Sequence, residues 1–281
     1  LGAANILNQV KDDFEGTVKL IFQPGEERLP GGASLMIKEG ALENPTPTSI
    51  IGQHVYPQLE AGKVGMRPGM YMASADEIHV TVKGKGGHAA LPHNCIDPVV
   101  ITSHIIVALQ QVISRRTKPG NPSVLTFGRV IADGATNIIP DEVTLQGTFR
   151  AMDEEWRLEA HGILKKMAEQ MAEAMGGSCD FEVRMGYPCV LNDEALTKQS
   201  FAAAQAYLGK ENVVLLEPRM TGEDFSYYSQ MMPGCFYRLG TGNKEKGITS
   251  GVHMPTFDID ESALEIGSGL MAWLAVSALK G

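Results

Sequence analysis

The sequence lacks the features of several protein classes. Its four cysteines, Cys95, Cys179, Cys189 and Cys235, show no CxxC spacing, which indicates reduced thiols of a cytoplasmic protein and not a disulfide framework. The formal net charge is −9, and this argues against nucleic acid or a membrane as a partner because both attract basic surfaces. No apolar run reaches transmembrane length.

Several catalytic motifs are also missing. The sequence has no Gly-x-Ser-x-Gly elbow and no cysteine with a histidine in a supporting motif, so covalent catalysis is not indicated. The glycine-rich segment 84–93 lacks both GxGxxG spacing after a parallel strand and a GK[ST] motif. A phosphate cradle is therefore not predicted there.

Length and composition indicate an ordinary globular chain of about two domains. It has 281 residues, of which 43% are hydrophobic and 20% charged, and domains average roughly 150 residues. The chain starts at Leu1, inside a predicted helix over 1–10. We therefore expect that an N-terminal portion is absent, which leaves targeting signals out of view.

The hydrophobic pattern predicts one α/β domain interrupted by another domain. Predicted strands over 17–22 and 49–55 flank a predicted helix that ends at Gly40, which is typical of a right-handed parallel crossover. The α/β pattern resumes after the interruption with a helix over 193–208, strands over 213–216 and 234–240, and a closing helix over 260–279. The outer domain is expected to comprise residues 1–74 and 187–281.

The inserted segment 75–186 has a pattern of its own. Strands are predicted over 77–82, 123–131, 142–152 and 179–185, with long helices over 98–116 and 153–175. The order is β-α-β-β-α-β, which is the ferredoxin-like arrangement with an antiparallel sheet.

Glu26 and Glu27 form the first candidate site. They follow the apolar run 17–22 and the Pro24-Gly25 turn, and ligand-binding groups of open α/β sheets lie beyond the carboxyl ends of strands. Adjacent carboxylates repel unless a cation holds them or one is protonated. A metal would satisfy both, with one Glu as ligand and the other accepting a proton from metal-bound water. The alternative is a pair of solvated loop residues.

Histidines supply further candidates in the outer domain. His54 stands at the carboxyl end of its predicted strand, where imidazole with carboxylate would suit a zinc-like ion; a structural histidine is the alternative. His253 lies in a loop before the closing helix, and spacing alone favours a surface residue. Asp224 and Glu223 are interpreted as capping carboxylates at a helix start.

Three residues of the inserted domain could bind a substrate. His88, Asn137 and Arg150 lie on loops or a strand end, and on one edge of the domain they could grip a carboxylate and an oxyanion. Random surface placement is the alternative. His79, His104 and His161 are interpreted as structural.

The motifs QPGEE, GQHV, GGHAALPH, NIIPDE, GTFR, GEDF and HMPTF occur in this order along the whole chain. This set resembles the aminoacylase and carboxypeptidase-G type metallopeptidases, in the N-acyl-amino-acid amidohydrolase branch with hippurate and auxin-conjugate hydrolases. The resemblance implies a phosphorylase/hydrolase-like α/β catalytic domain that holds two divalent metals. It also implies that the inserted domain is a ferredoxin-like lid through which a homodimer forms.

Roles follow from the resemblance residue by residue. Glu26 matches the general base, and Glu27, His54 and His253 match metal ligands. His88 matches a lid histidine that reaches the partner's active site and steadies the oxyanion. Asn137 and Arg150 match positions that contact the substrate carboxylate. Gly25 stands where the family often has Ala, and the family's Cys-Gly-His-Asp segment, expected just before Leu1, is missing.

The predicted activity is hydrolysis of N-acyl amino acids by a metal-activated water. Zinc, manganese, cobalt and nickel all suit mixed Glu and His ligands. Two alternatives stay open. One is a dipeptidase or exopeptidase of the same family, and the other is a non-catalytic truncated fragment that only dimerises through its lid.

Overall fold

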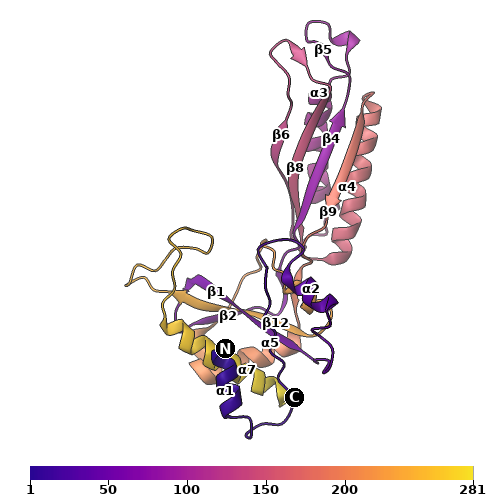
Figure 1. Ribbon diagram of the computed structural model, residues 1–281. Coiled ribbons are helices and arrows are strands. Elements are labelled where there is room, and N and C mark those ends of the chain that lie inside the picture. The colour runs from indigo at the N-terminus through magenta and orange to yellow at the C-terminus, as the bar shows by residue number, and fades with distance from the viewer. Residues whose placement is uncertain (281) are drawn as a thin grey trace. The chain divides into compact units, whose positions relative to one another are not determined.

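The computed structural model describes residues 1–280, which form two compact units (Figure 1). The first unit comprises 1–71, 190–219 and the residues from 224 onward, and the second comprises Met72–Cys189 with Met220–Glu223. The inserted unit is thus a few residues wider at each end than the segment 75–186, and it also takes in a short piece of the later chain.

The first unit is built on a mixed four-stranded sheet. Its strands are β1 (Ile50–Glu60), β12 (Gly234–Gly242), β2 (Val64–Met66) and β11 (Val213–Leu215), in the order β1-β12-β2-β11. β12 runs parallel to β1 and antiparallel to β2, while β2 and β11 are parallel. A separate pair is formed by β10 (Val190–Asn192) and β3 (Gly69–Met72). Every residue of β12 is buried, as expected for an inner strand with layers on both faces.

Helices complete the core of the first unit. α7 (Ser262–Leu279) packs against both α1 (Gly2–Gln9) and α5 (Glu194–Leu208). The shared core contains Leu196, Tyr237, Leu239, Leu270 and Leu274. Asp193 begins α5 by accepting a hydrogen bond from the Leu196 amide at 2.7 Å, which satisfies a donor of the first turn. The remaining short helices are α2 (Gly32–Lys38), α6 (Ser226–Ser229) and the 3-10 turn η3 (Lys210–Asn212).

The predicted strand over 17–22 is wrong. The structure assigns no strand there, and Leu20 and Phe22 are 47% and 64% exposed. An apolar, β-branched run forms a strand only where a neighbour satisfies its backbone groups. No strand among residues 1–280 pairs with this run. The predicted parallel crossover from it to 49–55 is wrong for the same reason, since β1 pairs with the distant β12.

The second unit is ferredoxin-like, as predicted. β4 (Asp76–Lys83), α3 (Pro98–Gln111), β6 (Ser123–Ile131), β8 (Glu142–Ala151), α4 (Glu154–Ala174) and β9 (Ser178–Arg184) follow in sequence, with a wide π-helical turn (η2, Val112–Arg116) extending α3. The sheet order is β6-β8-β4-β9, and every pairing is antiparallel. Alternate residues of β4, including Ile78 and Val80, are buried beneath α3 and α4. The small ribbon of β5 (Gly87–His88) and β7 (Ile138–Ile139) and the turn η1 (Pro92–Asn94) complete the unit.

A buried charge cluster joins β4 to the start of α4. The Asp76 carboxylate accepts hydrogen bonds from Arg157 Nε at 2.8 Å and lies 2.9 Å from His161 Nε2. Arg157 also donates to Glu154 and to the carbonyl of Gly186. Each nitrogen of this guanidinium thus donates to an acceptor inside the unit, which is what a buried charge requires.

Two helical stretches, Pro98–Arg116 and α7, are long and apolar enough to cross a membrane by length and composition alone. The expectation that no run reaches that length is therefore corrected. Core helices of soluble proteins can meet the same criterion. In this structure α3 packs against α4 and β8, and α7 against α1 and α5.

Candidate functional site

Glu26 and Glu27 lie on a tight loop between Pro24 and α2. Gly25 and Gly31 near its ends have φ values of +69° and +79°, a left-handed conformation that glycine adopts without strain. Asp224 holds both ends, accepting hydrogen bonds from Gln23 Nε2 at 2.6 Å and from the Ala33 amide at 3.0 Å. Asp224 therefore fixes the two ends of the loop that carries Glu26 and Glu27.

The surroundings of the Glu26 carboxyl favour its protonated form. Burial raises its pKa above the ordinary value, and the charges of Glu27 and Asp224 raise it further. His253 and Arg238 act in the opposite direction without cancelling the rise. A carboxyl group with a raised pKa is typical of a general base that must also return its proton.

His54 projects from β1, where its Cα pairs with that of Arg238 on β12. Its Nδ1 lies 2.6 Å from the Val55 carbonyl oxygen. Since a carbonyl can only accept, Nδ1 carries the proton and the lone pair is on Nε2. Burial and the charge of Arg238 lower the pKa of His54 to about 4. The ring is thus neutral near pH 7, and a backbone-anchored neutral imidazole is the usual form of a metal-binding histidine.

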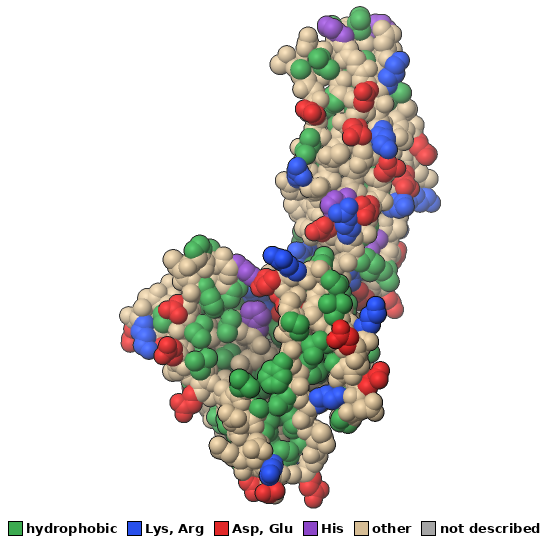
Figure 2. Space-filling view, viewed as in Figure 1, with side chains coloured by type: hydrophobic (Ala, Val, Ile, Leu, Met, Phe, Trp, Pro, Cys, Tyr) green, Lys and Arg blue, Asp and Glu red, His purple; other side chains and the backbone are tan. Residues whose placement is uncertain are grey.

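His253 approaches the glutamate loop from the other end of the chain. It has a φ of +68°, an uncommon conformation for a residue with a side chain, and such residues cluster at functional sites. A 2.7 Å hydrogen bond between Ser250 Oγ and Thr256 Oγ1 closes its loop. Its Nδ1 lies 3.8 Å from Glu27 Oε2, with both side chains well exposed. Figure 2 shows histidine and acidic side chains grouped on this face of the first unit.

The donor chemistry of these residues fits a divalent ion. Glu27, His54 and His253 offer the carboxylate and imidazole groups that zinc-like ions prefer. However, within residues 1–280 no three His, Cys, Asp or Glu side chains are close enough together to hold a metal ion. The chain therefore supplies suitable ligands but no complete cluster.

Two arginines near His54 were missed by the sequence analysis. Arg238 is only 4% exposed, donates to the Tyr71 hydroxyl at 3.1 Å and lies 5.2 Å from the Phe236 ring centre. Arg219 stacks 4.9 Å from the ring centre of Tyr56. A charged residue inside the otherwise apolar strand 234–240 was the signal that could have identified Arg238.

His88 and Asn137 lie together in the second unit, on the β5–β7 ribbon. The Ala89 amide donates to the Asn137 carbonyl at 2.9 Å, and the Ala90 amide donates to His88 Nδ1 at 3.1 Å. Because Nδ1 accepts, the proton of a neutral His88 is on Nε2. This exposed N–H is a free-standing donor of the kind that stabilises a developing oxyanion.

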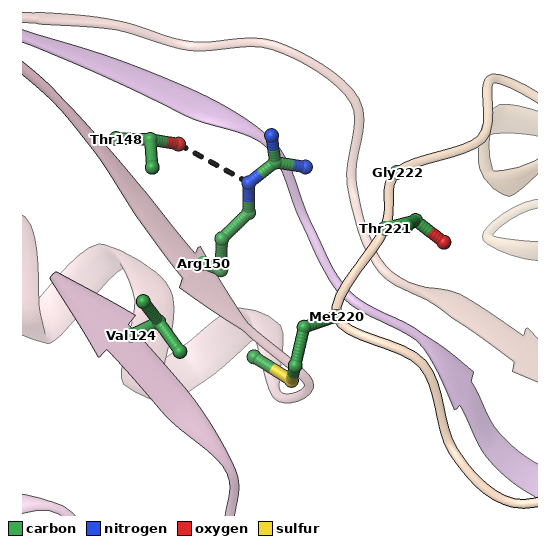
Figure 3. Close-up of a pocket in the computed structure, with 6 residues that line it drawn as sticks. All are labelled: Val124, Thr148, Arg150, Met220, Thr221 and Gly222. Carbon is green, nitrogen blue, oxygen red and sulfur yellow. Dashed lines mark hydrogen bonds between the residues drawn. The ribbon is translucent and has the colours of Figure 1, made fainter. Parts of the chain in front are cut away.

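Arg150 does not share that edge, which corrects the expectation of one three-residue group. It stands near the end of β8, which starts at Glu142 beside the ribbon, roughly 27 Å along the strand at about 3.4 Å per residue. Its Nε donates to Thr148 Oγ1 at 3.1 Å. Figure 3 shows it in a pocket beside the 220–222 segment. Burial lowers its pKa from the usual arginine value, although an arginine stays charged.

Comparison with known proteins gives a consistent picture. The family model described as Peptidase family M20/M25/M40 matches residues 1–276. The chain is 39% identical over 287 residues to IAA-amino acid hydrolase ILR1-like 4 of Arabidopsis thaliana, covering 99% of this chain and 64% of that protein. It is 36% identical over 280 residues to N-acetylcysteine deacetylase of Bacillus subtilis, covering 100% of this chain and 71% of that protein.

A solved structure agrees with these matches. The Bacillus subtilis YXEP protein, described as a dinuclear metal-binding peptidase of the M20 family, superposes with a TM-score of 0.82 at 33% identity. The alignment covers 99% of this chain and 70% of that one. The chain thus spans about two thirds of the length of the relatives that it matches. The resemblance inferred from the ordered motifs is confirmed.

Proposed function

The chain belongs to peptidase family M20/M25/M40, and from this we propose that it forms most of a metal-dependent amidohydrolase for N-acyl amino acids. Two relatives named for amino-acid conjugates, the auxin-conjugate hydrolase and the acetylcysteine deacetylase, support this substrate class. The observation that carries the proposal is the meeting of Glu27 with His253, 3.8 Å apart, beside a Glu26 whose pKa is raised.

Glu27, His54 and His253 are the residues that would hold metal. A divalent ion in such a site supplies water whose pKa is lowered from 15.7 to about 7 in the zinc case. The Glu26 carboxylate accepts the proton of the attacking water and returns it to the leaving nitrogen. The raised pKa of Glu26 suits both directions of this transfer.

The inserted unit supplies the polar groups that face the substrate. His88 Nε2–H donates to the amide oxygen as it gains negative charge, an interaction typically worth about 2.7–4 kcal/mol. Asn137 accompanies His88 on the ribbon, while Arg150 offers a guanidinium for the substrate carboxylate at the other end of β8. Because roughly 27 Å of β8 separates Arg150 from the ribbon, His88 and Arg150 of one copy do not reach the same small substrate, and the proposal assigns them to different copies of a dimer.

A homodimer through the inserted unit is the proposed assembly. β6 is an edge strand of its sheet, and Val124, Val130 and Ile131 on it are 37%, 51% and 40% exposed. Val107 on α3 is 74% exposed. An edge strand with unpaired backbone groups beside an apolar helix face can join a second copy symmetrically. Val107→Asp should then shift the protein from dimer to monomer in analytical ultracentrifugation, and an unchanged mass would contradict this interface.

The activity is tested with the complete protein loaded with metal. Glu26→Gln should abolish hydrolysis of N-acyl amino acids while metal content, measured by mass spectrometry, stays the same. Glu39→Gln, an exposed glutamate that follows α2, is the matched control and should keep full turnover. Near-normal activity of Glu26→Gln would exclude it as the base.

The competing functions need separate measurements. Rates on a panel of N-acyl amino acids and dipeptides distinguish an acylase from a dipeptidase or exopeptidase. For the non-catalytic alternative, the metal content of residues 1–281 alone is decisive, since two tightly held ions per chain would contradict it. The identity of the metal and a cytoplasmic location stay predictions.

A further inference from the structure

Asp224 is a buried carboxylate that does not cap its own helix. It is 0% exposed, and α6, which begins two residues later, has no side-chain cap. The two carboxylate oxygens instead bind two groups far away in sequence, Gln23 Nε2 at 2.6 Å and the Ala33 amide at 3.0 Å. Since a buried carboxylate is costly without partners, these two bonds account for its presence here.

Gln23 and Ala33 lie just outside the two ends of the 24–32 loop, and we call the place where these ends meet the neck of the loop. A Cβ atom added to Gly32 would lie 1.6 Å from the Pro24 carbonyl oxygen, so the two ends of the loop touch directly. Gln23 precedes this contact and Ala33 follows it. One oxygen of Asp224 therefore binds Gln23 before the loop, and the other binds the Ala33 amide after it. Ala33 is in the first turn of α2, where an acidic group is favoured.

Packing keeps Asp224 itself in place. The next residue, Phe225, stacks on Phe236 with ring centres 4.9 Å apart. A Cβ atom on Gly52 of β1 would lie 2.7 Å from the Phe225 ring, so this ring fits closely against the sheet. The carboxylate is thus a rigid extension of the core.

We propose that Asp224 is a positioning residue, which clamps the neck of the 24–32 loop and so fixes Glu26 and Glu27 relative to the sheet that carries His54. This inference rests on the proposed function, because it concerns the geometry of the same site. A shift of about 1 Å in catalytic groups can lower turnover by about 10²-fold. Loss of the clamp releases both glutamates at once.

The experiment compares Asp224→Ala with Asp224→Asn in the complete, metal-loaded protein. Alanine removes both hydrogen bonds, and we expect kcat to fall by about 10²-fold with a much smaller change in KM. Asparagine can keep both bonds, because its Oδ1 accepts from Ala33 while its Nδ2 donates to Gln23 with that amide turned over. The Asp224→Asn variant should therefore keep kcat within about tenfold of the wild type. The double variant Gln23→Glu with Asp224→Asn, which exchanges the carboxylate and the amide, should do the same.

A matched control separates positioning from simple destabilisation. Asp193→Ala removes a helix-capping carboxylate from the same unit, at a cost of about 1 kcal/mol, and should leave kcat unchanged. The inference is overturned if Asp224→Ala folds and keeps kcat within threefold of the wild type. It is also overturned if Asp193→Ala lowers kcat as much.

Hydrogen–deuterium exchange tests the clamp independently of catalytic activity. Asp224→Ala should speed the exchange of the Ala33 amide and of residues 25–32, while α5 keeps its protection. Unchanged exchange there would refute the clamp even if the enzyme proved active. Conversely, if Asp224→Ala exchanges faster but the wild-type protein hydrolyses no N-acyl amino acid, the proposed function is refuted and the clamp is retained.

Discussion

Replacing Arg157 should lower the unfolding free energy of the inserted unit more than any surface substitution does. Its side chain is 2% exposed and that of its partner Asp76 is 0% exposed. The Arg157→Met variant keeps a similar length but leaves the Asp76 carboxylate buried without its principal counter-charge.

The size of the effect follows from the contacts that remain. Breaking one partner of a buried pair costs about 3–5 kcal/mol, because the other charge stays uncompensated. His161 and the Gly186 amide still face Asp76, so we expect the lower end, about 3 kcal/mol. Removing both charges with Asp76→Leu and Arg157→Met should cost less than the sum of the single variants, because neither member of the buried pair is then left facing a missing partner.

The chain offers a direct reporter and a matched control. It has two tryptophans, Trp156 beside Arg157 in the second unit and Trp273 in α7 of the first. In a Trp273→Phe background, urea unfolding followed by fluorescence reports the inserted unit alone. Arg184→Met breaks an ion pair with Glu182 in which both side chains are more than half exposed, and it should change the stability much less, because solvent screens such a pair. Equal losses for Arg157→Met and Arg184→Met would refute the reasoning.

Three further results are expected. The pKa of Asp76 lies below its ordinary value because, although burial raises it, the hydrogen bonds and charges of Arg157 and His161 outweigh burial. The stability from this pair is therefore present above about pH 4 and lost as the pH falls further; urea titrations between pH 3 and 7 should show a steeper decline for the wild type than for Asp76→Asn, and parallel curves would contradict this. Asp153 caps α4 by accepting a hydrogen bond from the Trp156 amide at 2.7 Å, so Asp153→Ala should lower the unfolding free energy by about 1 kcal/mol. Thermal denaturation measures this loss, and Glu155→Ala, which removes a carboxylate that does not cap the helix, is the control. His88→Ala in the complete enzyme should lower kcat far more than it raises KM, and an unchanged kcat would remove His88 from the mechanism.

Local signals were enough wherever an element is stabilised by its own neighbours. Asp153 and Asp193 stand as predicted at the starts of α4 and α5, because a cap needs only donors three residues away. β6 and β8 have the predicted bounds to within a residue, since each pairs with strands of the same inserted unit. The order of elements then leaves few topologies open.

Long-range partners decided the rest. The run 17–22 has the composition of a strand but no partner strand within residues 1–280. Asp224 was interpreted as the cap of its own helix, and the structure places its carboxylate on Gln23 and Ala33 instead. Asn137, on a loop tip, and Arg150, at a strand end, were expected on one edge of the domain, but the length of β8 separates them.

The sequence alone determined which residues carry carboxylate and imidazole groups, the family to which the chain belongs, and the ferredoxin-like insertion, because motif order and hydrophobic period are local properties. The tertiary structure decided that His253 meets Glu27 and that Asp224 holds the glutamate loop. Contacts between segments so far apart in sequence depend on how the sheet brings them together, and no local pattern records that.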